Sequence, residues 1–221
     1  MKRFLKNTII MSNKLISFKV IIASIATLLL LSACIGCSGQ GDGNFDNAFN
    51  HALKTSVTID SGKLSGSGNI WKIGKKTITV ITASHVIDDK EDITVYFWNG
   101  DHASAQVFTN NAEKDYCLLT VKVDDTKKID IEELKPAKAL PESGANIFMV
   151  IPDYNTASAG LVASPETFSE DFNQDVIYCY LDVNEGMSGG GLFDYKGRYL
   201  GLLLGGSDEG EGVFLNATDI H

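Results

Sequence analysis

The chain has 221 residues, of which 44% are hydrophobic and 21% are charged, and this globular composition argues against general disorder. The first 33 residues hold five of the 19 basic residues and none of the 28 acidic ones, so the remainder carries a net charge of −14. A body this acidic repels nucleic acid and anionic lipid, and we therefore exclude a DNA- or RNA-binding function.

The N-terminus has the pattern of an export signal. Residues 1–19 are basic and polar, and the 12 residues from Val20 to Leu31 form an apolar run. This length suits the core of a signal peptide better than a membrane span, which needs about 20 residues. We therefore expect residues 1–33 to be a signal peptide, with Met11 as an alternative start.

The apolar run ends in a sequence that resembles the lipobox of bacterial lipoproteins. Leu31 is followed by two small residues and then by Cys34. By this resemblance Cys34 is lipidated, and the chain is exported and held by its lipid at a membrane of the bacterial cell envelope. An ordinary secretory signal or an uncleaved anchor is the alternative. The small, polar, glycine-rich segment that follows predicts a flexible tether over residues 34–51.

Twelve short β-strands are predicted in a folded domain over residues 52–221. Apolar and polar residues alternate in them, and Gly, Asn and Asp separate them every eight to twelve residues or so, which is typical of antiparallel sandwiches or barrels. The predicted strands are Ser56–Asp60, Gly66–Ile73, Thr77–Thr82, Asp92–Trp98, His102–Thr109, Tyr116–Val123, Asn146–Ile151, Ala157–Ser164, Asp175–Leu181, Gly191–Asp194, Arg198–Leu204 and Gly212–Leu215.

The strands fall into two sets of six. Between them, residues 124–145 are highly charged and contain two of the four prolines, which is typical of a linker. We therefore expect two similar halves, at about residues 52–123 and 146–221. Cys117 and Cys179 lie in apolar runs, one in each half, and we expect both to be buried thiols, with a disulfide between them as the alternative.

Three segments carry residues that could form a nucleophilic site. His85 follows an apolar strand, Asp115 opens another, and Ser188 lies among glycines in Gly186-Met187-Ser188-Gly189-Gly190. A serine hydroxyl needs a base to remove its proton, and an imidazole needs an acceptor to hold its far nitrogen. A glycine two positions before the serine lets the amides of Gly186 and Ser188 turn inward and bind a developing oxyanion.

The order His, Asp, Ser is the order of the chymotrypsin fold. His85 and Asp115 lie in the first strand set and Ser188 in the second, so the site is expected in a cleft between two halves. Glu113 and the pair Asp88 and Asp89 are alternative acids.

These residues resemble the trypsin-like serine proteases, in particular the bacterial Deg-type (high-temperature-requirement) protease domains. Similar pieces are Gly66-Ser67-Gly68, Gly160–Ser164 and Gly197–Leu202, and the resemblance runs from about Ser56 to Asp219. It implies an all-β fold of two six-stranded antiparallel β-barrels. It also implies that His85 is the general base, Asp115 its orienting acid and Ser188 the nucleophile, and that the amides of Gly186 and Ser188 form the oxyanion hole.

The chain departs from the family pattern just before the nucleophile. The family usually has Asn or Asp where this chain has Met187, so activation by pairing with a newly formed N-terminal amine is not expected. Only 33 residues follow Ser188, so regulation by a PDZ domain is not expected either.

Substrate contacts are expected from two segments. Asp182, six residues before Ser188, is a candidate for the base of the specificity pocket, which would favour Lys or Arg; an aspartate facing solvent is the alternative. Leu203, Leu204 and Gly205 are expected to form one wall of the pocket.

The other histidines, His51, His102 and His221, are interpreted as non-catalytic. No ligand spacing predicts a metal site, no glycine-rich loop predicts a phosphate site, and we expect no cofactor. The chain is therefore expected to be a lipid-anchored serine endopeptidase that acts on polypeptides. The alternative is a catalytically silent protease-fold lipoprotein that acts as a binding module.

Overall fold

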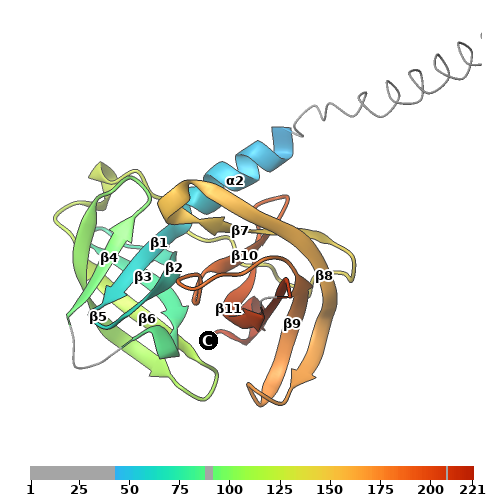
Figure 1. The fold of residues 1–221 in the computed structure, drawn as a ribbon. Helices are drawn as coiled ribbons and strands as arrows, with labels where there is room; N and C mark the ends of the chain where they lie inside the picture. The colour runs from blue at the N-terminus through green and yellow to red at the C-terminus, as the bar shows by residue number, and fades with distance from the viewer. Residues whose placement is uncertain (1–42, 88–91, 208) are drawn as a thin grey trace, which may run out of the picture. The chain divides into compact units, whose positions relative to one another are not determined.

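The computed structural model describes residues 43–87, 92–207 and 209–221, and within these ranges the chain forms two closed antiparallel β-barrels (Figure 1). The first barrel has the strand order β1-β2-β3-β6-β5-β4, and the second has β10-β11-β12-β9-β8-β7. The predicted fold class is confirmed, and each predicted strand corresponds to an observed one. The first barrel consists of β1 (Ser56–Ser61), β2 (Leu64–Ile73), β3 (Thr77–Ala83), β4 (Ile93–Phe97), β5 (His102–Asn111) and β6 (Tyr116–Lys122). The second consists of β7 (Asn146–Ile151), β8 (Thr156–Ser169), β9 (Gln174–Tyr180), β10 (Gly191–Asp194), β11 (Tyr199–Ser207) and β12 (Glu211–Asn216).

Alternating side chains fill the barrels. In β4, Ile93, Val95 and Phe97 are buried, whereas the residues between them are not. Burying side chains of this size stabilises the fold by about 1.5–3 kcal/mol each. One buried cluster continues from the first barrel into the second, where it includes Phe148 and Phe193, so the two barrels share an apolar interface.

The segment before the first strand is partly helical, which corrects the expected tether. Helix α2 (Gly43–Thr55) covers residues 43–51 of that segment, and Ala48 and Ala52 on it are buried. The ring of Phe45 meets the ring of Phe148 edge-on, at 5.2 Å between centroids. Phe45, Ala48 and Ala52 have the three- and four-residue spacing of an apolar helix face, and packing on the second barrel stabilises that helix. The rest of the tether, Cys34 and the signal peptide lie outside the described residues.

The connection between the barrels is pinned to both of them. The amide of Leu134 donates to the carbonyl of Ile70 in the first barrel at 2.9 Å, and the amide of Ala137 donates to the carbonyl of Tyr199 in the second at 2.8 Å. Such backbone partners hold the connection without a strand of its own, because residues 124–145 contain only the short 3₁₀ turn η2 (Thr126–Lys128).

Cys117 in β6 and Cys179 in β9 are both buried, in different barrels, and no disulfide joins them, which confirms the prediction of buried thiols. Burial raises the pKa of the Cys179 thiol to about 12, so this thiol stays protonated at neutral pH. No helix among the described residues is long and apolar enough to cross a membrane.

Candidate active site

His85 lies at the end of the first barrel, directly after β3. The strand leads into the 3₁₀ turn η1 (Ser84–Val86), in which Val86 is buried and anchors the turn while the His85 side chain remains 45% exposed. The Thr82 hydroxyl, near the end of β3, donates to the Ser67 carbonyl at 2.7 Å and fixes this end of the strand against β2. The imidazole therefore lies partly exposed at an end of the barrel whose backbone is held by Val86 and Thr82.

Asp115 holds the His85 imidazole from the loop between β5 and β6. Its Oδ2 is 2.7 Å from Nδ1 of His85, its Oδ1 accepts from the His85 backbone amide at 3.0 Å, and its carbonyl accepts from the Ser84 amide at 3.2 Å. Asp115 has a φ of 54°, a left-handed conformation that Asp tolerates better than most residues. These three contacts fix both the position and the tautomer of the imidazole.

The pairing with Asp115 also shifts the pKa of His85. The hydrogen bond to Asp115 is the main cause that raises the pKa of His85 above 6.5, and partial burial opposes the shift. Of the alternative acids, Glu113 is exposed and makes no hydrogen bond to His85, and Asp88 and Asp89 lie outside the described residues.

Ser188 lies in the loop between β9 and β10, and this loop is clamped onto the first barrel. The Ser188 carbonyl accepts from the Ser67 amide at 2.8 Å. The next residue, Gly189, has a φ of 83°, and a Cβ there would overlap the Ser67 carbonyl and the Thr82 hydroxyl. Only glycine fits so close to the strand that leads to His85.

The two expected oxyanion amides are available. The Met187 amide donates to the Asn184 carbonyl at 3.1 Å and closes a turn in which Gly186 has a φ of 86°, the positive value that a type II turn requires at this position. The amides of Gly189 and Gly190 donate to protein carbonyls as well. Among the described residues, the amides of Gly186 and Ser188 have no acceptor, as oxyanion donors require.

Met187 stabilises this turn through its side chain. The residue is 3% exposed, and its sulfur accepts from the Asn184 amide at 3.2 Å. The turn is thus closed by two contacts between Asn184 and Met187. Neither contact needs a charged side chain at position 187.

The expected hydrogen bond between the Ser188 hydroxyl and the His85 ring is not formed in this structure. Among the described residues, the Ser188 hydroxyl makes no hydrogen bond, and the His85 ring bonds only to Asp115. The two segments meet at Gly66, where a Cβ would lie 2.7 Å from a Val86 methyl and 2.9 Å from the Ser188 carbonyl. In unliganded enzymes such a contact is often long and tightens when substrate binds.

A pocket of about 240 Å³ opens beside Ser188, lined by Val183–Glu185, Ser188, Leu203 and Gly205–Ser207. Leu203 and Gly205 lie in its wall as expected. Leu204 does not line it, because this side chain is 3% exposed and packs into the shared core.

Asp182 is also outside this pocket, which corrects the first assignment. Leu181 is buried and Asp182 is exposed, so the next side chain, Val183, is the one that turns into the pocket. The Asp182 carboxylate instead lies near Gly210, where a Cβ would be 3.2 Å from Oδ1. The aspartate faces solvent, as the alternative interpretation expects.

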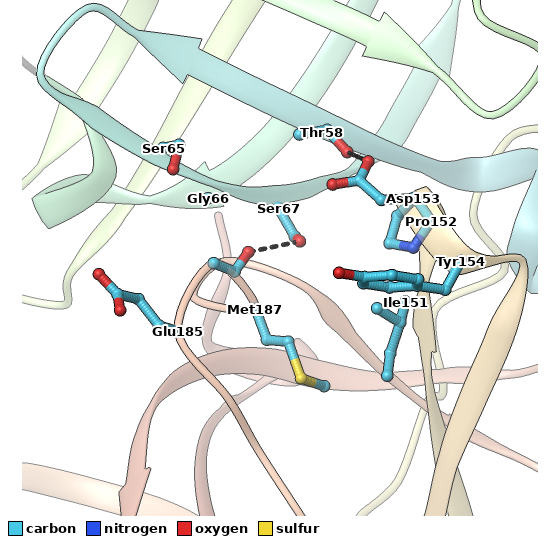
Figure 2. A pocket seen from close by; sticks show the side chains of 11 residues that line it. Thr58, Ser65, Gly66, Ser67, Ile151, Pro152, Asp153, Tyr154, Glu185 and Met187 are labelled. Atoms are coloured by element: carbon cyan, nitrogen blue, oxygen red, sulfur yellow. Dashed lines mark hydrogen bonds between the residues drawn. The ribbon is translucent and has the colours of Figure 1, made fainter.

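Sequence reasoning assigned no role to Ser67, and the structure gives it two. Besides its amide contact to Ser188, its hydroxyl donates to the Gly186 carbonyl at 2.9 Å (Figure 2). This residue lies in the Gly66-Ser67-Gly68 motif, but only the fold brings it to the turn that Asn184 and Met187 close around Gly186, which we call the oxyanion turn. Figure 2 also shows a second cavity on this side of the turn, about 340 Å³ in volume.

The remaining histidines lie elsewhere. His51 in α2 is buried, with Nδ1 2.5 Å from the Glu132 carboxylate, and His102 opens β5 and stacks on Tyr96. The carbonyl of His221 accepts from the Tyr116 hydroxyl at 2.8 Å. The described part of the chain contains no group of three His, Cys, Asp or Glu residues that could hold a metal ion.

Known proteins are similar to this chain in sequence. Residues 66–202 match the family described as trypsin-like peptidase domain. A serine protease HtrA-like of Staphylococcus epidermidis is 24% identical over 83% of this chain and 38% of its own length. A serine protease Do-like HtrA of Bacillus subtilis is 24% identical over 72% of this chain and 37% of its own length. The chain thus spans less than two fifths of the length of these curated relatives.

Solved structures share the fold. A serine endoprotease from Yersinia pestis is 21% identical, with a TM-score of 0.65 over 79% of this chain and 62% of that chain. The active form of a protease from M. tuberculosis is 22% identical, with a TM-score of 0.64 over 78% of this chain and 80% of that chain. At these identities the likeness establishes the arrangement of the two barrels.

Proposed function

The chain belongs to the trypsin-like peptidase family, and from this premise we propose that it is a serine endopeptidase with His85, Asp115 and Ser188 as its catalytic triad. The observation that carries the proposal is the hold of Asp115 on His85 through both carboxylate oxygens. The two unpaired amides of Gly186 and Ser188 add support, because a silent binding module has no need of them.

The proposed reaction starts with the hydroxyl of Ser188. His85 Nε2 takes its proton while Oγ bonds to the carbonyl carbon of the scissile peptide, and the amides of Gly186 and Ser188 bind the oxyanion that forms. Asp115 stabilises the resulting imidazolium. His85 then gives its proton to the leaving amine as the C–N bond breaks, which leaves an acyl ester on Ser188. Water, deprotonated by His85, hydrolyses this ester and restores the enzyme.

The proposed location is the bacterial cell envelope, where the exported chain is held at a membrane by a lipid on Cys34. The lipobox-like sequence that ends at Cys34 supports it. A relative from Marinomonas, 30% identical over 56% of this chain and 26% of its own length, is named a probable periplasmic serine endoprotease DegP-like.

A silent protease-fold binding protein is the competing function, and one observation favours it. The Ser188 hydroxyl has no hydrogen bond to His85, so the nucleophile is not yet activated in this conformation. The pocket beside Ser188 could bind a peptide without cleaving it.

A fluorophosphonate probe separates the two functions, because it bonds only to a serine oxygen that a base activates. We expect the full chain to be labelled at Ser188, with labelling lost in Ser188→Ala and reduced in His85→Ala. Ser143→Ala, at an exposed serine outside the site, is the matched control and keeps the label. An intact, folded chain that takes no label and cleaves no peptide would establish the silent alternative.

A further inference from the structure

The cavity of about 340 Å³ in Figure 2 lies next to the reacting centre but is separate from the pocket beside Ser188. Its walls are Ser65–Ser67 of β2, the 3₁₀ turn η3 (Pro152–Tyr154) with the preceding Ile151, Thr58 of β1, and Glu185–Met187 of the oxyanion turn. Glu185 belongs to both cavities, whereas Ser188 lines only the smaller one. The oxyanion turn is therefore the divide between them.

This position determines which part of a substrate the cavity can take. When the scissile carbonyl meets the amides of Gly186 and Ser188, the side chain before the scissile bond (P1) faces the smaller pocket. The chain after the bond then continues over the turn towards β2 and η3. Side chains of an extended peptide alternate, so the second residue after the bond (P2′) faces the same side as P1. That side is the second barrel, to which η3 belongs, and P2′ therefore meets this cavity.

The cavity presents acceptors and negative charge. Asp153 Oδ1 accepts from the Thr58 hydroxyl at 2.7 Å, and in Figure 2 its second oxygen points away from Thr58 towards the interior of the cavity. Glu185 adds a second carboxylate at the opposite end, and no basic residue is among the lining residues. The Ser67 hydroxyl, which also lines the cavity, already donates to the Gly186 carbonyl.

The wall between the two carboxylates suits a long side chain. The Tyr154 ring is 79% exposed and projects over the cavity beside Pro152. A lysine or arginine can lay its methylene stem on such a surface and place its charge at a carboxylate beyond it. A further cavity of about 410 Å³ is also lined by Thr58, Pro152 and Asp153, and Asp153 is exposed.

We propose that this chain selects substrates with lysine or arginine at P2′, and that Asp153 is the residue that determines this specificity, with a smaller contribution from Glu185. The proposal rests on the proposed endopeptidase function, because it names the substrate of that same site. Asp153 and Glu185 are specificity residues, and neither takes part in the chemical steps.

The test is a cleavage profile of the full chain on a peptide mixture produced by a glutamate-specific protease, with cut sites read by mass spectrometry. We expect Lys and Arg to be enriched at P2′ in the parent. We expect Asp153→Asn to abolish most of the enrichment and Glu185→Gln to reduce it. The amide oxygen that Asp153→Asn introduces can still accept from Thr58, so the variant should have the same thermal unfolding temperature as the parent. Asp182→Asn, at an acid outside both cavities, is the matched control and leaves the profile unchanged.

Two peptides that differ only by Lys or Gln at P2′ give the size of the effect. We expect kcat/KM to be about fivefold higher for the lysine peptide, the upper end for a solvent-exposed ion pair, and the ratio to fall at high salt and in Asp153→Asn. Cleavage without a P2′ preference, or with a preference that Asp153→Asn retains, overturns this inference and leaves the peptidase proposal standing. A folded chain that cleaves nothing and takes no fluorophosphonate overturns the peptidase proposal, and this inference with it.

Discussion

Asp115 is the residue whose conformation is most closely tied to its proposed task. A φ of 54° directs one carboxylate oxygen to the backbone and the other to the ring of His85. A left-handed conformation costs an L-residue about 1 kcal/mol or more, and here three hydrogen bonds offset it. In the proposed triad, Asp115 contacts His85 and not Ser188, so its role would be to orient the base.

Asp115→Asn should keep the loop and lose the chemistry. The amide oxygen can still accept from the His85 backbone, but the NH₂ group then faces Nδ1 and favours the wrong tautomer. We expect turnover to fall by about 10⁴, the loss known for this change in a serine protease with the same triad. The measurement is kcat/KM against pH, with thermal unfolding in parallel.

The pH profile distinguishes an orienting acid from a structural one. His85 must be neutral to act as a base, so activity falls as the pH drops through its pKa. Asp115 raises that pKa, and without it the acid limb should move to lower pH. Because the folded pKa is raised, the stability from this pairing is complete below pH 6.5 and is lost as the pH rises through the folded pKa. Near-normal turnover in the Asn variant would assign the orienting role to another acid.

At the scale of elements, the site depends on how closely the Ser188 loop approaches β2 and β3. The Ser67 amide and hydroxyl bond to the carbonyls of Ser188 and Gly186, the residues on either side of Met187. Thr82 bonds to Ser67 from the strand that leads to His85. Ser188 and His85, the proposed nucleophile and base from different barrels, are therefore positioned by the same short stretch of β2.

Gly189→Ala should separate the two barrels at this point. The new methyl would lie 2.7 Å from the Ala83 amide and would overlap Thr82 and the Ser67 carbonyl, in a backbone conformation with φ of 83°. We expect loss of fluorophosphonate labelling and a free energy of unfolding lower by about 2–4 kcal/mol, from overpacking and strain together.

The matched control is Gly100→Ala. Gly100 has a φ of 86°, but no atom lies within 4 Å of an added Cβ, so this variant has the strain without the clash. It should lose only about 1 kcal/mol of stability and keep full labelling. Equal losses in both variants would show that backbone strain, and not the contact between the loop and β2, is what matters.

At the scale of the whole molecule, helix α2 reduces the number of residues between the folded domain and its proposed anchor. The described structure begins at Gly43, nine residues after Cys34, whereas the sequence predicted a tether up to residue 51. Nine residues reach at most about 30 Å. If Cys34 carries a lipid, this length sets the largest distance between the lipid and the start of α2.

Cys34→Ser should release the protein from the membrane, because the acyl chains supply the membrane affinity. We expect it to move from the membrane to the soluble fraction, with unchanged kcat/KM on a short peptide, since α2 and both barrels are intact. Mass spectrometry of the mature N-terminus is the direct measurement. An unmodified N-terminus at another residue would make the lipoprotein proposal wrong.

The sequence by itself determined the strands and the positions of the three proposed catalytic residues along the chain. Period-two runs such as Ile93–Phe97 fold as predicted, because the inward face of such a strand is buried in the barrel and must be apolar. The order and spacing of His85, Asp115 and Ser188 were readable because each residue lies next to a strand end or within a glycine turn with a local signature. The Asp115–His85 pair then follows from the pairing of β3 with β6.

Only the tertiary structure decided the features that depend on contacts between distant segments. Helix α2 lies in a polar stretch and was missed, because its apolar face acquires a partner only when Phe148 of β7 packs on it. Asp182 was a candidate for the pocket, with a position facing solvent as the alternative. The sequence could not decide between them, because the orientation depends on where β9 ends and a shift of one residue moves a side chain to the other face. The cavity at Asp153 joins β1, β2, η3 and the oxyanion turn, four segments far apart in sequence, so its acceptor-rich wall leaves no pattern along the chain.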